Sequence, residues 1–340
     1  MEGHLSDRGW IVAAALVVGL ELAAATAIWA LTGYSGLPSA GFHVAFVSAF
    51  GFLSLAALFV CAFAKLMWQG ADRPTYRLAS AAWALRWRAL ATFAGLQILA
   101  LHFVAFNWTK AMLPMVVPFW LDRPLAAFDA ALFGQQAWSW AHAAAGPFVS
   151  PVRWLYMLWL PIQLIAAALV LHVRPSTKKT EVTTAYFTTW LIGGALSYPL
   201  SSAGPLFYGR LELGDEFVSL LAQEYLANVR QVADYLWFSH VHRDVGLGVG
   251  ISAMPSMHVA IATWIMIAAH AFARPLLGAS VIFFAAIFFG SFLLGWHYFL
   301  DAPGGVACAC VGWLVAKRVA RASSSSRPPS SLVPADSKKA

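Results

Sequence analysis

Charged side chains and cysteines are both scarce in this sequence. Only 11% of the 340 residues are Asp, Glu, Lys or Arg, against about 25% in typical soluble domains, which argues against the two water-soluble domains that the length would suggest. The three cysteines all lie in apolar stretches, which argues against a disulfide framework. Hydrophobic residues instead make up 60% of the chain, and the mean hydropathy is +0.69. The composition predicts an all-α integral membrane protein.

Eight apolar stretches are long enough to cross, as helices, a bilayer core of about 30 Å. They cover residues 10–32, 42–66, 89–110, 151–173, 183–201, 256–274, 276–298 and 302–319. We therefore expect about eight transmembrane helices. Glu21 lies inside the first stretch, where an acid is expected to pair with a neighbouring helix.

These stretches divide the chain into three parts. Residues 1–88 are expected to form two N-terminal transmembrane helices and a basic cytoplasmic loop, and residues 89–320 the main membrane core. Residues 321–340, rich in Ser and Pro, are expected to form a disordered cytoplasmic tail.

Basic residues are divided unequally between the two sides that an eight-span count defines. Of the 22 Lys and Arg residues, sixteen fall on the side that holds both termini. By the positive-inside rule, both termini should be cytoplasmic. The net charge of +7 is then explained by topology, and neither a nucleic acid nor a soluble protein partner is indicated.

The opposite side carries the remaining six basic residues and two long connections, about 111–150 and 202–255. Within the first, residues 126–144 are expected to form a surface-lying or re-entrant helix. Long connections confined to one side indicate that a site is built there.

A proline, a serine and a histidine begin the sixth apolar stretch. Pro255 and Ser256 suit the start of a helix, where a serine side chain can accept from a backbone amide. A helix start also offers free N–H groups and a partial positive charge, which favour a phosphate. His258 would lie within the first turn, close to any anion held there.

A second histidine lies four residues before an aspartate. If the turn between His297 and Asp301 is helical, both side chains project from one face and can touch. A carboxylate on one imidazole nitrogen fixes the tautomer and leaves the other nitrogen free as nucleophile or base. In the expected topology, His258, His297 and Asp301 converge at the extracytoplasmic face.

Two segments resemble signature motifs of the type 2 phosphatidic acid phosphatase (PAP2) superfamily. Pro255-Ser256-Met257-His258 is similar to its second motif, and Gly295-x-His297-Tyr298-x-x-Asp301-x-x-x-Gly305 is similar to its third. The resemblance covers residues from about 89 to 319 and implies a six-helix core bundle.

The resemblance also implies the roles of four residues. His297 would attack phosphorus to form a phosphohistidine, and Asp301 would orient it. His258 would protonate the leaving alcohol and then activate the acceptor, while Ser256 and nearby amides would hold phosphate oxygens. The substrate would be a lipid in the bilayer, and no metal or other cofactor would be needed.

The chain departs from the family pattern in two places. The usual first motif is Lys, six residues, then Arg-Pro, but here twelve residues separate Lys110 from Arg123-Pro124. The usual third motif has an arginine six positions before its histidine, and here that position is Ser291. Other cations must then compensate the phosphate charge. The candidates, in order of preference, are Arg210, Arg243, Lys110 and Arg123.

The missing arginines, together with the segment Gly204-Pro205-x-x-Tyr208, resemble the sphingolipid synthase and inositol phosphorylceramide synthase branch. That branch transfers a phospho-headgroup between lipids. The expected function is therefore a lipid phosphatase or phosphotransferase, acting on a lipid phosphate or phosphodiester in a bacterial inner (plasma) membrane. Asp122 and Asp129 are expected to form an ion pair with Lys110 or Arg123, or to lie beside the site.

Two alternatives belong to other classes. In a metal-dependent membrane hydrolase, His258, His297 and Asp301 would be the ligands, although the helix-borne H-E-x-x-H zinc motif is absent. A transporter would need charged groups near mid-membrane, and only Glu21 qualifies.

Overall fold

The computed structural model describes residues 2–34, 40–243 and 248–325, and within these ranges the regular secondary structure is helical, with no strand. This confirms the all-α prediction. The α-helices are α1 (Glu2–Thr32), α2 (Ala40–Trp68), α3 (Pro74–Ala84), α4 (Arg86–Val116), α5 (Asp122–Phe133), α6 (Ala137–Ala145), α7 (Val149–Met157), α8 (Trp159–His172), α9 (Thr177–Leu196), α10 (Val218–Leu221), α11 (Ala227–His242), α12 (Met257–Phe272), α13 (Leu277–Leu293) and α14 (Asp301–Ser325).

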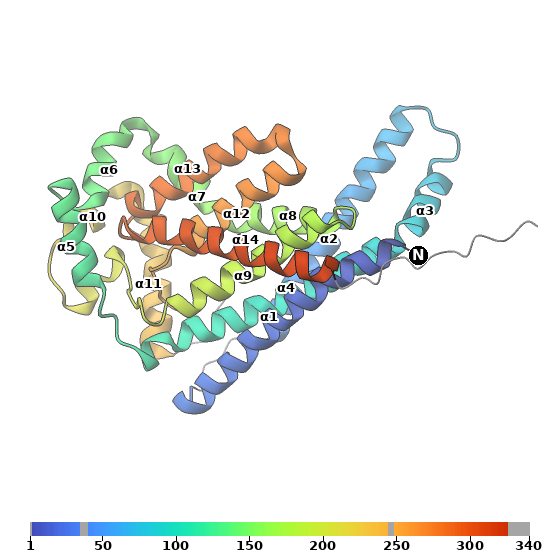
Figure 1. The fold of residues 1–340 in the computed structure, drawn as a ribbon. Helices are drawn as coiled ribbons and strands as arrows, with labels where there is room; N and C mark the ends of the chain where they lie inside the picture. Colours follow the sequence, from blue (N-terminus) through green and yellow to red (C-terminus); the bar gives the residue numbers. More distant parts are fainter. Residues whose placement is uncertain (1, 35–39, 244–247, 326–340) are drawn as a thin grey trace, which may run out of the picture.

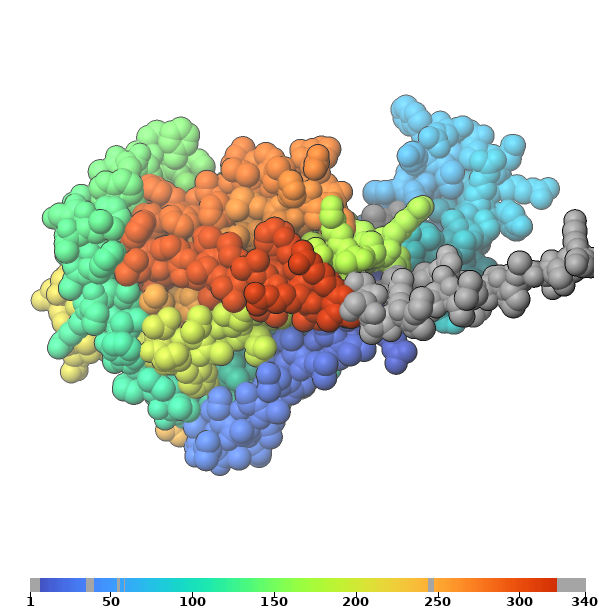
Figure 2. Space-filling model, in the orientation of Figure 1, coloured from blue at the N-terminus to red at the C-terminus, as the bar shows by residue number. Residues whose placement is uncertain are grey.

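The bundle is built around α9, α12 and α14. Helix α14 packs along α9, where the Thr188 hydroxyl donates to the Gly312 carbonyl at 3.0 Å, and α12 packs on α13 and α14. Helices α1 and α4 lie side by side against this group (Figure 1). The first half of α2 packs on α4, whereas its second half leans away from the bundle with α3, and Figure 2 shows this part as a lobe at the right of the view.

Three helical segments of the described residues are long and apolar enough to cross a membrane. They are Asp7–Thr32, Arg86–Val116 and Arg274–Leu293. Segments Ala137–Met157 and Trp159–His172 add a fourth if this pair, bent by 48°, counts as one span. Each of the eight expected stretches overlaps a helix. Helix α12 is shorter than these segments, and α9 and α14 are more polar, whereas α2 is an apolar helix of 29 residues. Helix α9, for example, buries Thr184 and Thr189 against protein, so its sequence does not need the hydropathy of a lipid-facing helix.

The outer connections and the C-terminus differ in detail from the expectations. The surface helix expected at 126–144 is two helices, α5 and α6. Residues 321–325, expected in the disordered tail, continue α14, and residues 326–340 lie outside the described residues.

Two buried pairs of side chains fasten α1 to the bundle. Lys179 Nζ lies 2.8 Å from Asp7 Oδ1, which also accepts from Trp10 Nε1 at 2.6 Å. Glu21 Oε2 lies 2.6 Å from His102 Nδ1 on α4. The expected pairing of Glu21 with a neighbouring helix is thus confirmed. A buried charge is tolerated only when it has such a partner.

Replacing Lys179 with methionine should therefore destabilise the protein strongly. The change leaves the Asp7 carboxylate buried without its cation, which costs about 3 to 5 kcal/mol. Unfolding of the detergent-solubilised protein by denaturant would measure this loss. The double variant Asp7→Asn/Lys179→Met removes both charges and should recover most of the stability. Equal stability of Lys179→Met and the unmodified protein would contradict the prediction.

Candidate active site

A cavity of about 550 Å³ lies where α2, α4, α8, α9 and α12 approach one another. Its lining is mostly apolar, and four of the described lining side chains can carry positive charge: His43, Lys110, His258 and His297. The cavity therefore combines an apolar wall with a cluster of groups suited to an anion.

His297 is held by the buried carboxylate of Asp301. Its Nδ1 lies 3.3 Å from Asp301 Oδ2, which also accepts from the Tyr298 N–H at 3.0 Å. The sequence prediction of a contact between His297 and Asp301 is confirmed, but its helical explanation is wrong. Helix α13 ends at Leu293 and α14 begins at Asp301. His297 therefore lies in the non-helical segment between them, and this segment places it against Asp301 at the start of α14.

Ser256 joins the start of α12 to His297. It is the N-cap of α12, and its hydroxyl accepts from the Val259 N–H at 3.4 Å, which confirms the predicted helix start. The same hydroxyl lies 3.1 Å from His297 Nε2. The Ser256 N–H donates to the Asp301 carbonyl at 2.9 Å. A Cβ at Gly305 would overlap the Ser256 carbonyl, so only glycine lets α14 come this close.

His258 lies beside His297, between two aromatic side chains. The centroids of the two imidazole rings are 5.9 Å apart, with an angle of 67° between the planes. The His258 ring stacks on Tyr156 at 4.9 Å and contacts Trp159 at 4.2 Å. Trp159 Nε1 also donates to the His258 carbonyl at 3.0 Å. This packing fixes the ring next to the second histidine.

Asp122 lies beside the site, the second of its two expected placements, and forms no ion pair with Lys110 or Arg123 among the described residues. Its buried carboxylate accepts from the Ala203 and Gly204 N–H groups at 2.9 and 2.8 Å and from the Tyr298 hydroxyl at 2.9 Å. Gly204 has φ of +101°, and a Cβ there would meet the Trp296 carbonyl. Asp122 thereby holds the 203–204 segment against the turn that carries His297.

Asp129 supports the same turn from α5. It is 2% exposed and accepts from the Phe299 N–H at 3.2 Å. Burial raises its pKa to about 7, against the partial stabilisation of the carboxylate by that hydrogen bond. None of the ion pairs between described residues involves Asp122 or Asp129.

The four candidate cations lie in different places. Lys110 lines the cavity with both histidines. Arg210 forms an ion pair with Asp234 and lies 5.7 Å from the Trp237 ring, and Arg123 is exposed on α5. Neither arginine is among the described residues that line the cavity.

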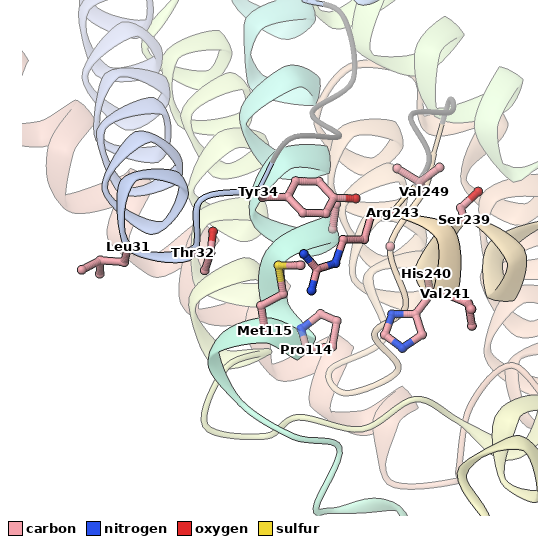
Figure 3. Close-up of a pocket in the computed structure, with 12 residues that line it drawn as sticks. Leu31, Thr32, Tyr34, Pro114, Met115, Ser239, His240, Val241, Arg243 and Val249 are labelled. Atoms are coloured by element: carbon pink, nitrogen blue, oxygen red, sulfur yellow. The ribbon is translucent and has the colours of Figure 1, made fainter.

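Arg243 lines a second pocket, of about 620 Å³, between the ends of α1, α4 and α11. Its side chain points into the space between Tyr34 and Met115 (Figure 3). Gly250 lines both this pocket and the cavity that contains the two histidines, so the pocket borders that cavity. Within the described ranges, no three His, Cys, Asp or Glu side chains are grouped as a metal site would require.

A family model described as the PAP2 superfamily matches residues 123–315, more than half of the chain. The matched region contains Ser256, His258, His297 and Asp301, and α1 to α4 lie outside it. No curated protein and no solved structure matches the chain.

The raised pKa of Asp129 predicts a pH-dependent stability. In the unfolded chain this carboxyl titrates near its ordinary value of 3.8, so the stability that its protonated form contributes is present below that pH and is lost as the pH rises through about 7. Asp129→Asn cannot ionise. The melting temperature of this variant, relative to the unmodified protein, should therefore increase steadily from pH 4 to pH 8. A difference that does not change with pH would contradict the assignment.

Proposed function

The chain belongs to the PAP2 superfamily, and from this premise we propose that it is a lipid phosphatase or phosphotransferase working through a phosphohistidine. The observation that carries the proposal is the chain of contacts Asp301–His297–Ser256, with His297 and His258 side by side in the cavity lining. A carboxylate on Nδ1 makes Nε2 the reactive nitrogen of His297, and this nitrogen is turned toward Ser256 at a helix start, where a phosphate is favoured.

In the first step, His297 Nε2 attacks phosphorus and an N–P bond forms as the bond from phosphorus to the leaving oxygen breaks. His258, as imidazolium, gives its proton to that leaving oxygen. The two rings are near enough to reach one phosphoryl group, as an in-line displacement requires. The Ser256 hydroxyl and the amides at the start of α12 would hold the oxygens on phosphorus.

In the second step, neutral His258 takes a proton from an incoming hydroxyl, whose oxygen attacks phosphorus as the N–P bond breaks. Water as acceptor gives hydrolysis, and a lipid alcohol gives transfer. Either outcome restores His297 and the protonated His258, so the cycle closes.

We place this chemistry at the extracytoplasmic face of a bacterial inner membrane, with both termini in the cytoplasm. Several basic residues of the expected cytoplasmic side gather at one end of the bundle. Arg88 donates to the His172 carbonyl at 2.5 Å, and Lys179 pairs with Asp7 near the start of α1. Lys317 and Arg318 lie near the end of α14, whereas the site lies at its start. The distribution supports the positive-inside orientation.

A specific observation favours headgroup transfer from a phosphodiester as the second candidate. Lys110 is the only Lys or Arg among the described residues that line the cavity. A phosphodiester has one negative charge, whereas a phosphate monoester has up to two near neutral pH. One lysine and one imidazolium therefore match the charge of a phosphodiester more closely than that of a phosphate monoester.

Substitution of the histidines tests the function. Purified protein in vesicles should release phosphate from phosphatidate or transfer a headgroup from phosphatidylinositol to a lipid alcohol. His297→Ala should abolish the acid-labile phosphoenzyme, and His258→Ala should lower kcat by about 10²- to 10⁴-fold. His270→Ala, an exposed histidine at the far end of α12, is the matched control. Full activity of His297→Ala would rule out the mechanism.

Substitution of Lys110 tests its role as the phosphate cation. Lys110→Met should lower kcat/KM by about 10²- to 10³-fold, because the developing negative charge loses a donor in a water-poor cavity. Lys110→Arg should recover part of the rate, and Arg210→Met, outside the cavity, should change it little. A larger effect at Arg210 than at Lys110 would reverse the assignment of the cation.

A further inference from the structure

Part of the cavity lining comes from helices outside the matched region. Helix α2 contributes His43, Phe46 and Val47, and α4 contributes a stripe that ends in Lys110. The matched region supplies both catalytic histidines and the rest of the lining, including Trp159 and Trp190. The N-terminal helices add a surface against which the remainder of the substrate would lie.

A polar pair interrupts this otherwise apolar wall. Asn107 Nδ2 lies 2.7 Å from His43 Nε2, and His43 is 3% exposed. Both line the cavity among Phe46, Phe103 and Phe106. Polar groups inside membrane-spanning helices are costly, and they are a frequent mark of function when they face a cavity. An amide nitrogen has two N–H groups, so one can bond to His43 while the other is directed elsewhere.

The depth of this pair follows from its position on α4. Asn107 precedes Lys110 by three residues, so the two share a face and are separated by about 4.5 Å along the helix axis. Phe103 lies about one further turn away from Lys110 on the same helix. From the catalytic end inward, α4 thus presents a cation, then an amide, then aromatic rings.

A phospholipid has the same order of groups. Its anionic phosphate is followed, within a few covalent bonds, by an acyl carbonyl and then by hydrocarbon chains. We propose that Asn107, supported by His43, binds an acyl carbonyl oxygen of the substrate lipid, with the chain beyond it against Phe103 and Phe106. This inference rests on the proposed function. Only a phosphate held near Lys110 and His297 would place the acyl carbonyl of the same lipid at the level of Asn107.

Ester-linked and ether-linked lipids give a direct test. Dioleoyl phosphatidate has ester carbonyls, its dialkyl ether analogue has none, and ceramide 1-phosphate has an amide carbonyl. The unmodified protein should process the ester lipid with a kcat/KM about tenfold above that of the ether analogue. Asn107→Leu should reduce this preference to within about twofold, mainly through loss on the ester lipid. A parallel loss on ceramide 1-phosphate would extend the site to amide carbonyls, and an undiminished rate there would restrict it to esters.

Two further variants separate recognition from structural support. Phe103→Leu changes the chain surface without removing a hydrogen bond, so it should affect the ester and ether lipids equally. His43→Gln keeps a hydrogen-bonding side chain and should retain at least half of the preference, which gives a second measurement if Asn107→Leu folds poorly. No ester preference in the unmodified protein, or equal losses on both lipids in Asn107→Leu, would overturn the proposal.

Equilibrium binding keeps this test separate from the test of catalysis. His297→Ala protein, which should bind lipid without turnover, is titrated with vesicles that contain the ester or the ether lipid, with and without Asn107→Leu. A binding preference for the ester that disappears in Asn107→Leu supports the carbonyl site even if no phosphate is released by the unmodified enzyme. Phosphate release without any such preference would support the enzyme and reject the carbonyl site.

Discussion

The buried aspartate at the start of α14 is the constraint on which the site depends. The Asp301 side chain holds His297 Nδ1 and the Tyr298 N–H, while its backbone carbonyl accepts from the Ser256 N–H. One residue therefore joins the two sequence motifs, which come from different helices. Because Asp301 has no exposed surface, its carboxylate depends on these donors in place of water. Loss of the Asp301 carboxylate would disturb both the orientation of the His297 ring and its distance from Ser256.

Two further carboxylates, both on α5, hold the same region of the backbone. Asp122 binds two successive backbone amides and the Tyr298 hydroxyl, and Asp129 binds the Phe299 N–H. The turn with His297 is not part of a helix, so it lacks the regular hydrogen bonds that would keep it in one conformation. The aspartates of α5 supply those bonds from outside. Helix α5 thus positions the segment that holds His297, although Arg123 on the same helix is not among the described residues that line the cavity.

The sequence was sufficient for those parts of the site that depend on local signals. Ser256 is a helix N-cap with a histidine in the following turn, and His297 and Asp301 have a spacing that permits contact, so the helix start and this contact could be predicted from local sequence. The contact of Asp122 with residues 203–204 and 298 could not be predicted. Its nearest cation in sequence is Arg123, which suggests an ion pair, and only the fold brings distant amides to it.

The sequence preferred Arg210 to Lys110 as the phosphate-binding cation, because local sequence does not show where the fold places each side chain. Arg210 follows the Gly-Pro-x-x-Tyr segment directly, but its side chain is turned to Asp234 and Trp237. Lys110 is far from the motifs in sequence, yet it lies on the cavity-facing side of α4. The span count also depended on the fold, because hydropathy marks contact with lipid, and α9 and α14 obtain much of their burial from each other.

The scarcity of cations in the cavity affects how the substrate must be held. A site with several arginines can hold a phosphate by charge alone, so the remainder of the substrate needs little recognition. With one lysine in the lining, charge gives less binding energy and less orientation. An in-line displacement still requires that phosphorus be placed accurately between the two imidazoles. Contacts with the rest of the lipid must then orient the phosphate. The part of the lining formed by α2 and α4 offers such contacts. The scarcity of arginines in the described lining and the wall contributed by α2 and α4 can then be explained together, by the need to position the substrate.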